Sequence, residues 1–153
     1  LKLPLLDRMY KEYPKGEAPA AMEDLAGKIR AADGFLFVTG EYNWGPQPGL
    51  KNLTDHYLEE WFWRPAAIAC YSAGSFAGVR AMMGWRDILG EMGMAVISSI
   101  LPVARIGKLF DAEGQPTGDD AKQLERLFPR FADHLIGWIH PARTQRAKVD
   151  PPY

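Results

Sequence analysis

The sequence contains little cysteine and no large excess of charge of either sign. A single cysteine, Cys70, occurs in 153 residues, so no internal disulfide can form and a reducing cytoplasm is the expected location. Because Cys70 lies within the apolar run AAIACYS, we expect it to be a core residue without a chemical role. Eighteen basic and 19 acidic residues give a net charge of −1, which does not attract nucleic acid or an anionic membrane. Neither is an expected partner.

Long apolar runs and clustered metal ligands are also missing. The longest apolar stretches, near residues 35–39 and 66–71, are far shorter than the roughly 20 residues that span a bilayer. The histidines at positions 56, 134 and 140 are scattered and lack partners at metal-ligand spacing. We therefore expect no membrane span and no metal site.

Side-chain catalysis has equally little support. Glu59 and Glu60 are adjacent in a helical pattern, so they point in different directions and are expected on a solvated face. Ser72 and Ser75 have no companion base and no nucleophile-elbow motif. We expect no catalytic side chain and no hydrolase.

Alternating helical and strand patterns are present along the chain. After LKLPLLDRMY, which reads as the end of a strand entering a loop, helices are expected over residues 18–33, 50–63 and 79–92. Apolar runs predict strands over residues 35–39, 66–72 and 94–103, the first buried on both faces. The third helix is expected to turn a set of apolar residues inward, namely Val79, Met82, Met83, Leu89 and Met92.

The C-terminal region predicts one more helix and a tail. Apolar residues recur at helical spacing from Leu124 to Ile139, and Pro129 within them predicts a kink or two segments. Residues 141–153 are expected to form a flexible tail. The whole pattern indicates one α/β domain with a parallel sheet and helices on both faces.

Two unusual segments follow two of the predicted strands. They are GEYNWGPQPGLKN, residues 40–52, and SAGSFAG, residues 72–78. The carboxyl ends of parallel strands share one rim of a sheet, where ligands bind, so we expect these segments to meet. Small residues let the backbone approach a flat ligand, and Tyr42, Trp44 and Phe76 could stack on it. Turn geometry would account equally well for the glycines, and core packing or a subunit contact for the aromatic residues. The second segment also bears a weak resemblance to a phosphate-binding loop, because it precedes the N-terminus of a helix.

In combination, these motifs resemble the NAD(P)H-dependent FMN reductase family of flavodoxin-like proteins. The likeness rests on GEYNWGPQPGLKN, AIACYSAGSFAGVRA and GMAVISSILPVARIGKLFDAEG, and it covers nearly the whole chain. The resemblance implies a flavodoxin-like three-layer sandwich that binds FMN. It also implies that NADPH or NADH reduces the flavin by hydride transfer and that a quinone, free flavin or similar small molecule accepts the electrons.

The resemblance further implies which residues border the flavin. Glu41, Tyr42, Asn43 and Trp44 would lie along one side of the isoalloxazine ring. The second segment would approach its other edge through Ser72, Ala73, Gly74, Ser75, Phe76 and Gly78. The family usually has Pro where this chain has Gly40, which would loosen the turn.

Another departure concerns the N-terminal side. Family members begin with a strand, a phosphate-gripping loop, a helix and a second strand, and none of these precedes Leu1. We therefore expect residues 1–153 to be a single, N-terminally incomplete domain that lacks the first β-α-β portion. In the strand order 2-1-3-4-5, this loss leaves a free strand edge, so the chain should aggregate or borrow a strand and bind FMN weakly or not at all.

The assembly and the exact function stay open at this stage. Relatives bind flavin near a dimer interface, which implies a homodimer or homotetramer. Five tryptophans, among them Trp44, Trp61 and Trp63, either support such an interface or pack in the core. Besides the FMN-dependent oxidoreductase, the alternatives are a flavodoxin-like electron carrier and a binding protein that has lost its cofactor.

Overall fold

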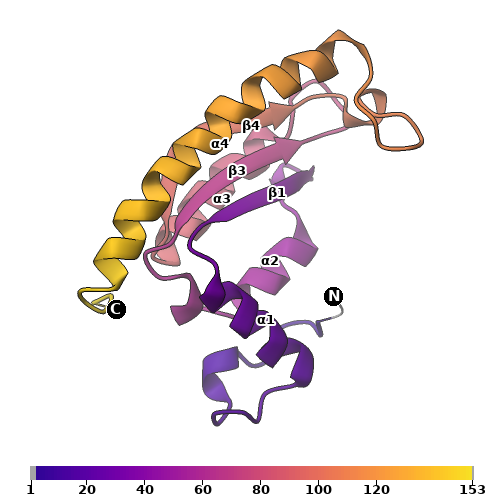
Figure 1. The fold of residues 1–153 in the computed structure, drawn as a ribbon. Helices are drawn as coiled ribbons and strands as arrows, with labels where there is room; N and C mark the ends of the chain where they lie inside the picture. Colours follow the sequence, from indigo (N-terminus) through magenta and orange to yellow (C-terminus); the bar gives the residue numbers. More distant parts are fainter. Residues whose placement is uncertain (1–2, 153) are drawn as a thin grey trace.

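The computed structural model describes residues 3–152 and is built around a four-stranded sheet (Figure 1). The strands are β1 (Phe35–Tyr42), β2 (Gly45–Pro46), β3 (Pro65–Tyr71) and β4 (Ala95–Val103). Their order is β2-β1-β3-β4; β1, β3 and β4 run parallel, and β2 pairs antiparallel with β1. The predicted parallel sheet is confirmed, while β2 was not predicted.

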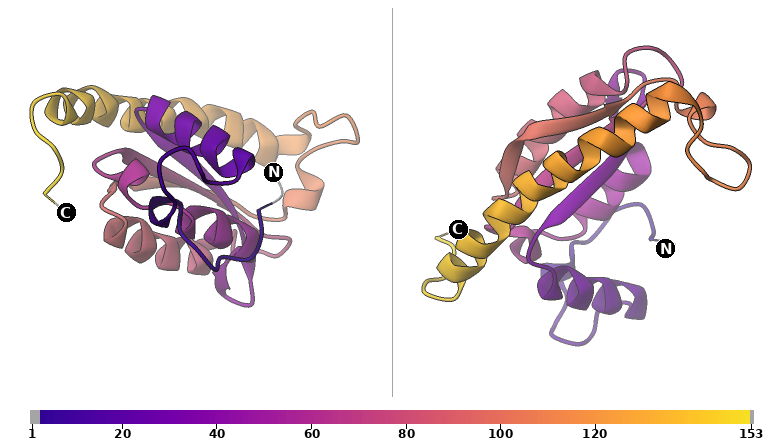
Figure 2. Two further views of the ribbon diagram at one scale, coloured as in Figure 1. Left: turned by 90° about the horizontal axis from the view of Figure 1, so that it is seen from below. Right: turned by 45° about the horizontal axis from the view of Figure 1, so that its top comes forward.

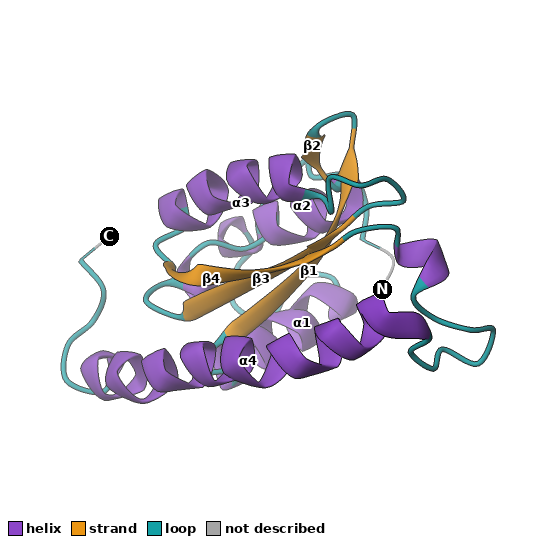
Figure 3. Ribbon diagram, turned by 90° about the horizontal axis from the view of Figure 1, so that it is seen from above, coloured by secondary structure: helices purple, strands orange, loops and turns teal. Residues whose placement is uncertain are grey.

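Helices cover both faces of this sheet. The α-helices are α1 (Ala20–Ala31), α2 (Pro48–Asp55), α3 (Val79–Glu91) and α4 (Gly118–Arg146). Short 3₁₀ turns, labelled η1 to η3, span Tyr10–Glu12, Glu59–Trp61 and Ile106–Lys108. Figure 3 shows α2 and α3 on one side of the sheet and α4 on the other, and the views in Figure 2 show α4 running along the strands. This arrangement confirms the predicted three-layer α/β fold.

The central strand β3 is buried on both faces. On the α3 side, Ile68 packs in a cluster with Phe37 and Trp85, and Trp85 has no exposed surface. On the α4 side, Ala69 packs with Phe131. Small alanines on this face of β3 let the long helix approach the sheet closely.

Strand β1 departs from its prediction, because only one of its faces is buried. Phe37 and Thr39 point into the core, whereas Leu36 and Val38 are 41% and 56% exposed. Helix α4 packs on β3 and β4, so these two side chains instead line an apolar groove of about 680 Å³. Among the described residues, the edge of β1 away from β3 pairs only at its last two residues, with β2. Residues 35–39 therefore have no strand partner at this edge, and the Gly40 N–H donates to the Gln47 side chain at 3.3 Å.

Helix α2 ends at Asp55, earlier than the predicted end near residue 63. The chain then turns, and Tyr57 and Trp61 enter the core with 1% and 3% exposure. The indole N–H of Trp61 donates to the Thr54 carbonyl at 3.2 Å, which fixes the turn. Trp61 is thus a core residue and lends no support to a subunit contact.

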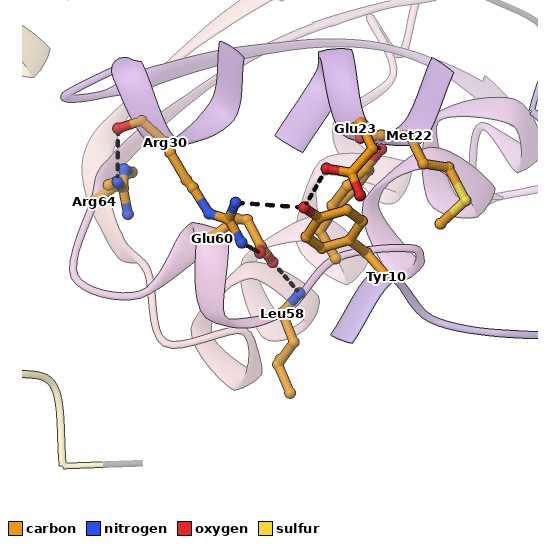
Figure 4. A network of polar contacts seen from close by, with 8 residues as sticks. Tyr10, Met22, Glu23, Arg30, Leu58, Glu60 and Arg64 are labelled. Carbon is orange, nitrogen blue, oxygen red and sulfur yellow. Dashed lines mark hydrogen bonds and ion pairs between the residues drawn. The ribbon is translucent and has the colours of Figure 1, made fainter. Parts of the chain in front are cut away.

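Glu60 is buried, contrary to the prediction of a solvated face. Its carboxylate accepts hydrogen bonds from Arg30 Nη2 at 2.7 Å and from the Leu58 N–H at 3.3 Å (Figure 4). Arg30 also donates to the Tyr10 hydroxyl at 3.4 Å, and that hydroxyl donates to Glu23 at 2.8 Å. This network joins η1, α1 and η2 and satisfies a carboxylate that is only 4% exposed.

Helix α3 follows its predicted pattern with one exception. Met82, Leu89 and Met92 are buried, but Met83 is 60% exposed and the prediction that it faces inward is wrong. The buried residues Ala81, Met82, Trp85 and Leu89 share one side of the helix, and Met83, a further rotation of about 100° beyond Met82, falls outside it. Trp85 takes the inward position instead.

Helix α4 is continuous through Pro129 and Pro141, so no break into two segments occurs. It ends at Arg146, whose guanidinium contacts Asp33 Oδ1 at 2.6 Å and the Trp63 carbonyl at 3.0 Å. Residues 141–146 are therefore helical, and the predicted tail boundary at residue 141 is wrong. Packing of the apolar face on β3 and β4 holds the helix together despite the missing proline N–H groups.

The N-terminal segment is held by α2. The side chain of Asn52 donates to the Pro4 carbonyl at 2.8 Å and accepts from the Leu6 N–H at 2.9 Å. Residues 3–8 contain no strand, and residues 1–2 lie outside the described part of the chain. Within residues 3–152, no helix combines the length and apolar character of a membrane span.

Candidate functional site

Two loops meet at the carboxyl ends of β1 and β3. The first loop, residues 40–47, comprises the end of β1, the turn and β2, and the second loop, residues 72–78, follows β3. Arg80, in the first turn of α3, lies between them: its guanidinium carbon is 4.6 Å from the ring centroid of Trp44 and 4.6 Å from that of Phe76. The prediction that the two segments share one rim is confirmed.

The first loop is a tight hairpin turn between β1 and β2. Asn43 and Trp44, its two central residues, have φ angles of +47° and +69°, as a type I′ turn requires. Asparagine tolerates this backbone region, but a bulky tryptophan does so only at an energetic cost. The turn leaves the Trp44 side chain 71% exposed above the rim.

The second loop is anchored by a third one that follows β4. The backbone N–H groups of Arg105 and Ile106 donate to the carbonyls of Gly74 and Ser72 at 3.0 and 3.1 Å. The Ser72 hydroxyl donates to the Gly74 carbonyl at 3.1 Å. Residues 73–76 stay exposed, with Phe76 62% exposed. The third loop was not predicted to take part in the site.

Backbone strain concentrates at this rim. Among residues 3–152, five non-glycine residues have positive φ angles, and Trp63 alone lies elsewhere. The other four are Asn43, Trp44, Ala77 and Arg105. Left-handed non-glycine residues persist where the surrounding structure enforces them, and they cluster at functional sites.

Gly78 allows the second loop to pass close to β3. Its φ is +77°, and a Cβ at this position would lie 2.7 Å from the carbonyl oxygen and 2.8 Å from the nitrogen of Tyr71. No other residue fits there without a backbone shift. Gly78 is also the N-cap of α3, so the helix starts without a capping side chain of its own.

Glu41 supplies the missing cap from the other loop. Its Oε2 accepts the backbone N–H of Arg80 at 3.2 Å, and its Oε1 forms an ion pair with the Arg80 guanidinium. Burial, which leaves the Glu41 side chain 5% exposed, by itself raises the pKa of the carboxyl. Hydrogen bonds from Arg80 and the Ala81 N–H, together with the positive charge, outweigh burial and lower that pKa.

This cap changes one interpretation of the second loop. The N–H groups in the first turn of α3 face the Glu41 carboxylate, which is itself negative. They are not free to bind a phosphate, so the interpretation of this helix terminus as a phosphate cradle is wrong.

The predicted site residues fall into two groups. An outer group stays open to solvent and consists of Tyr42, Asn43, Trp44, Ala73, Gly74, Ser75 and Phe76. The inner group lies beneath it and consists of Glu41, Ser72 and Gly78. Of these, Glu41 and Gly78 join β1 to α3, and Ser72 is partly buried. Whether these residues contact a flavin stays a prediction.

Arg80 is the residue of the site that the sequence did not identify. A cation in the first turn of a helix is unfavourable next to the helix dipole. That anomaly is the only signal in the sequence, because its partner Glu41 lies 39 residues away.

The chemistry of the rim suits a flat, polar-edged ring. Trp44 and Phe76 offer aromatic surfaces, and residues 73–75 offer exposed backbone next to them. Burial raises the pKa of the nearby Cys70 thiol to about 11, so it is not a nucleophile at neutral pH. The described residues contain no group of three or more side chains that could hold a metal ion. The isoalloxazine ring of FMN, which is flat and has polar edges, matches this chemistry and is the candidate ligand of the rim.

Comparison with known proteins identifies relatives in sequence. The family model described as NADPH-dependent FMN reductase matches residues 1–107. An NAD(P)H-dependent FMN reductase of Pseudomonas aeruginosa is 33% identical over 111 residues, which are 69% of this chain and 60% of that protein. A quinone reductase of Escherichia coli is 39% identical over 125 residues, which are 79% of this chain and 62% of that protein. The chain spans about three fifths of the length of these two curated relatives.

Solved structures support the fold independently. The flavoenzyme NAD(P)H:(acceptor) oxidoreductase from Paracoccus denitrificans has a TM-score of 0.69 and 24% identity, over 92% of this chain and 76% of that chain. An oxidoreductase from Corynebacterium diphtheriae has a TM-score of 0.63 and 18% identity, over 80% of this chain and 64% of that one. At these identities the similarity establishes the fold alone.

Proposed function

The chain belongs to the NADPH-dependent FMN reductase family, and we propose that it binds FMN on the rim that the first and second loops form, as an NAD(P)H-dependent reductase. When bound, FMN supplies a redox centre that takes two electrons from NAD(P)H and passes them to an acceptor. The observation that carries this proposal is the position of Arg80, which contacts Trp44 and Phe76 at once and so brings two aromatic side chains from separate loops to one rim.

The protein's own residues bind and orient the ring. Trp44 and Phe76 would cover apolar parts of the ring, and the exposed backbone of residues 73–75 would hydrogen-bond its polar edge. Gly74 has no atom within 4 Å of its Cβ position, so a ligand can approach the backbone closely there. We assign no acid or base to a side chain, because hydride transfer from NAD(P)H to FMN moves the electron pair and the hydrogen together.

The acceptor and the assembly are parts of the same proposal. An open rim favours a small flat acceptor such as a quinone or a free flavin, which can stack where the nicotinamide stacks. We propose a homodimer or homotetramer, because exposed aromatic side chains such as Tyr42 and Trp44 gain from burial between copies. The single, buried cysteine suits a reducing cytoplasm.

A titration with FMN tests where the ring binds. Trp44→Ala removes an aromatic wall and should weaken binding about tenfold, the usual contribution of one stacked aromatic contact. Trp138→Ala is the matched control, because Trp138 is 51% exposed on α4 away from the rim. Equal affinities for the two variants would contradict the proposed location.

Reduction by NADPH then decides between classes of protein. Bleaching of the bound flavin under anaerobic conditions is expected for a reductase. A flavin that stays oxidised would indicate the electron-carrier alternative, and a protein that does not bind FMN would indicate a binding protein without cofactor.

A further inference from the structure

The start of α3 depends on a residue from another strand. Gly78 cannot cap the helix with a side chain, and its close approach to Tyr71 excludes a residue that could. Glu41, at the end of β1, supplies the carboxylate instead and accepts the Arg80 N–H at 3.2 Å. The distance between the first and second loops is therefore fixed by a hydrogen bond as well as by the sheet.

Arg80 closes the same connection with its side chain. Its guanidinium forms an ion pair with Glu41, and its central carbon lies 4.6 Å from the ring centroids of both Trp44 and Phe76. An arginine can do both at once, because its edge donates hydrogen bonds while its faces attract aromatic rings. Trp44 and Phe76 are otherwise mostly solvent-exposed, so this contact restricts how they can turn.

We propose that Arg80 is a positioning residue for the flavin, which acts by holding Trp44 and Phe76 in a fixed arrangement while Glu41 holds Arg80. This inference rests on the proposed function and adds a residue to it. Pre-ordering the two aromatic side chains removes an entropy loss that would otherwise accompany binding of the ring. Arg80 thereby raises affinity for FMN through other residues.

Four variants, each made in the full-length protein that the gene encodes, test this role. Arg80→Met removes both the charge and the planar group and should raise the Kd for FMN about tenfold, the cost of ordering the two aromatic side chains on binding. Arg80→Lys keeps the charge for Glu41 but lacks the planar faces, so it should keep the thermal stability while the Kd still rises. Glu41→Gln should raise the Kd because it frees Arg80. Arg86→Met is the control, since Arg86 lies on the same helix but bonds to the Ser98 carbonyl.

The measurements are FMN affinity from quenching of flavin fluorescence, the midpoint of thermal unfolding, and the near-UV circular dichroism of the flavin-free protein. Arg80→Met should change the aromatic dichroism before flavin is added, which loss of a remote structural contact would not do. If Arg80→Met does not fold, Arg80→Lys decides, because an unchanged Kd for that variant overturns the inference.

The outcomes separate this inference from the proposed function. A wild-type protein that does not bind FMN would refute both. A wild-type protein that binds FMN, together with an unchanged Kd for Arg80→Lys, would refute the positioning role alone, whatever the Kd of Arg80→Met. A larger Kd for both, with Arg86→Met like the wild type, supports it.

Discussion

Replacing Gly78 by alanine should destabilise the protein strongly. The new Cβ would meet the carbonyl oxygen and the nitrogen of Tyr71 at 2.7 and 2.8 Å, and both atoms belong to a central, buried strand that cannot move freely. The overlap should cost about 1–3 kcal/mol, as overpacking does, and the left-handed backbone adds about 1 kcal/mol for a residue with a Cβ. The free energy of unfolding should therefore fall by about 2–4 kcal/mol, which lowers the Tm by about 5–15 °C for a chain of this length.

Urea unfolding followed by tryptophan fluorescence measures this change. Gly74→Ala is the matched control, because it lies in the same loop, has no positive φ and has open space around its Cβ position. The control should change the stability by less than about 0.5 kcal/mol. If the two alanine variants were equally stable, the argument that β3 and α3 require glycine at their junction would be refuted.

Three further predictions concern the core, the Glu41–Arg80 ion pair and the open face of β1. Thr39→Val should lower the free energy of unfolding by about 1–3 kcal/mol, because the buried Trp85 indole N–H loses its acceptor at 2.9 Å; unchanged urea stability would contradict this. Since the pKa of Glu41 is lowered by folding, its contribution to stability is present above its unfolded pKa and is lost as pH falls through the folded pKa. Glu41→Gln should remove that part of the acid dependence, and identical acid unfolding curves would argue against it. Val38→Lys should reduce self-association in sedimentation velocity by placing a charge on the open face of β1, whereas Val149→Lys, a control that is also about half exposed, should not.

The layers of the fold could be predicted because apolar periodicity records burial. The runs at residues 66–72 and 94–103 predicted β3 and β4, and the inward residues of α3 were correct except for Met83. Burial on both faces was wrong for β1, since periodicity cannot tell whether a helix will cover an apolar face. The end of α2 was missed for a similar reason: Trp61 finds its acceptor, Thr54, by folding back rather than by continuing the helix.

The candidate site was predictable only in part. Its two loops could be placed at one rim because parallel strands align their carboxyl ends. The pairing of Glu41 with Arg80 could not be found, since it joins residues from different elements and depends on the close approach of Gly78 to β3. Burial of Glu60 was missed in the same way, because Arg30 reaches it from another helix.

The most direct test of the central claim is the visible absorbance spectrum of the purified protein, as its gene encodes it, before and after NADPH is added without oxygen. A flavin spectrum that bleaches is the predicted result and would establish an NAD(P)H-reducible flavoprotein. A colourless protein that also fails to bind added FMN would contradict the claim that the two loops joined by Arg80 hold a flavin.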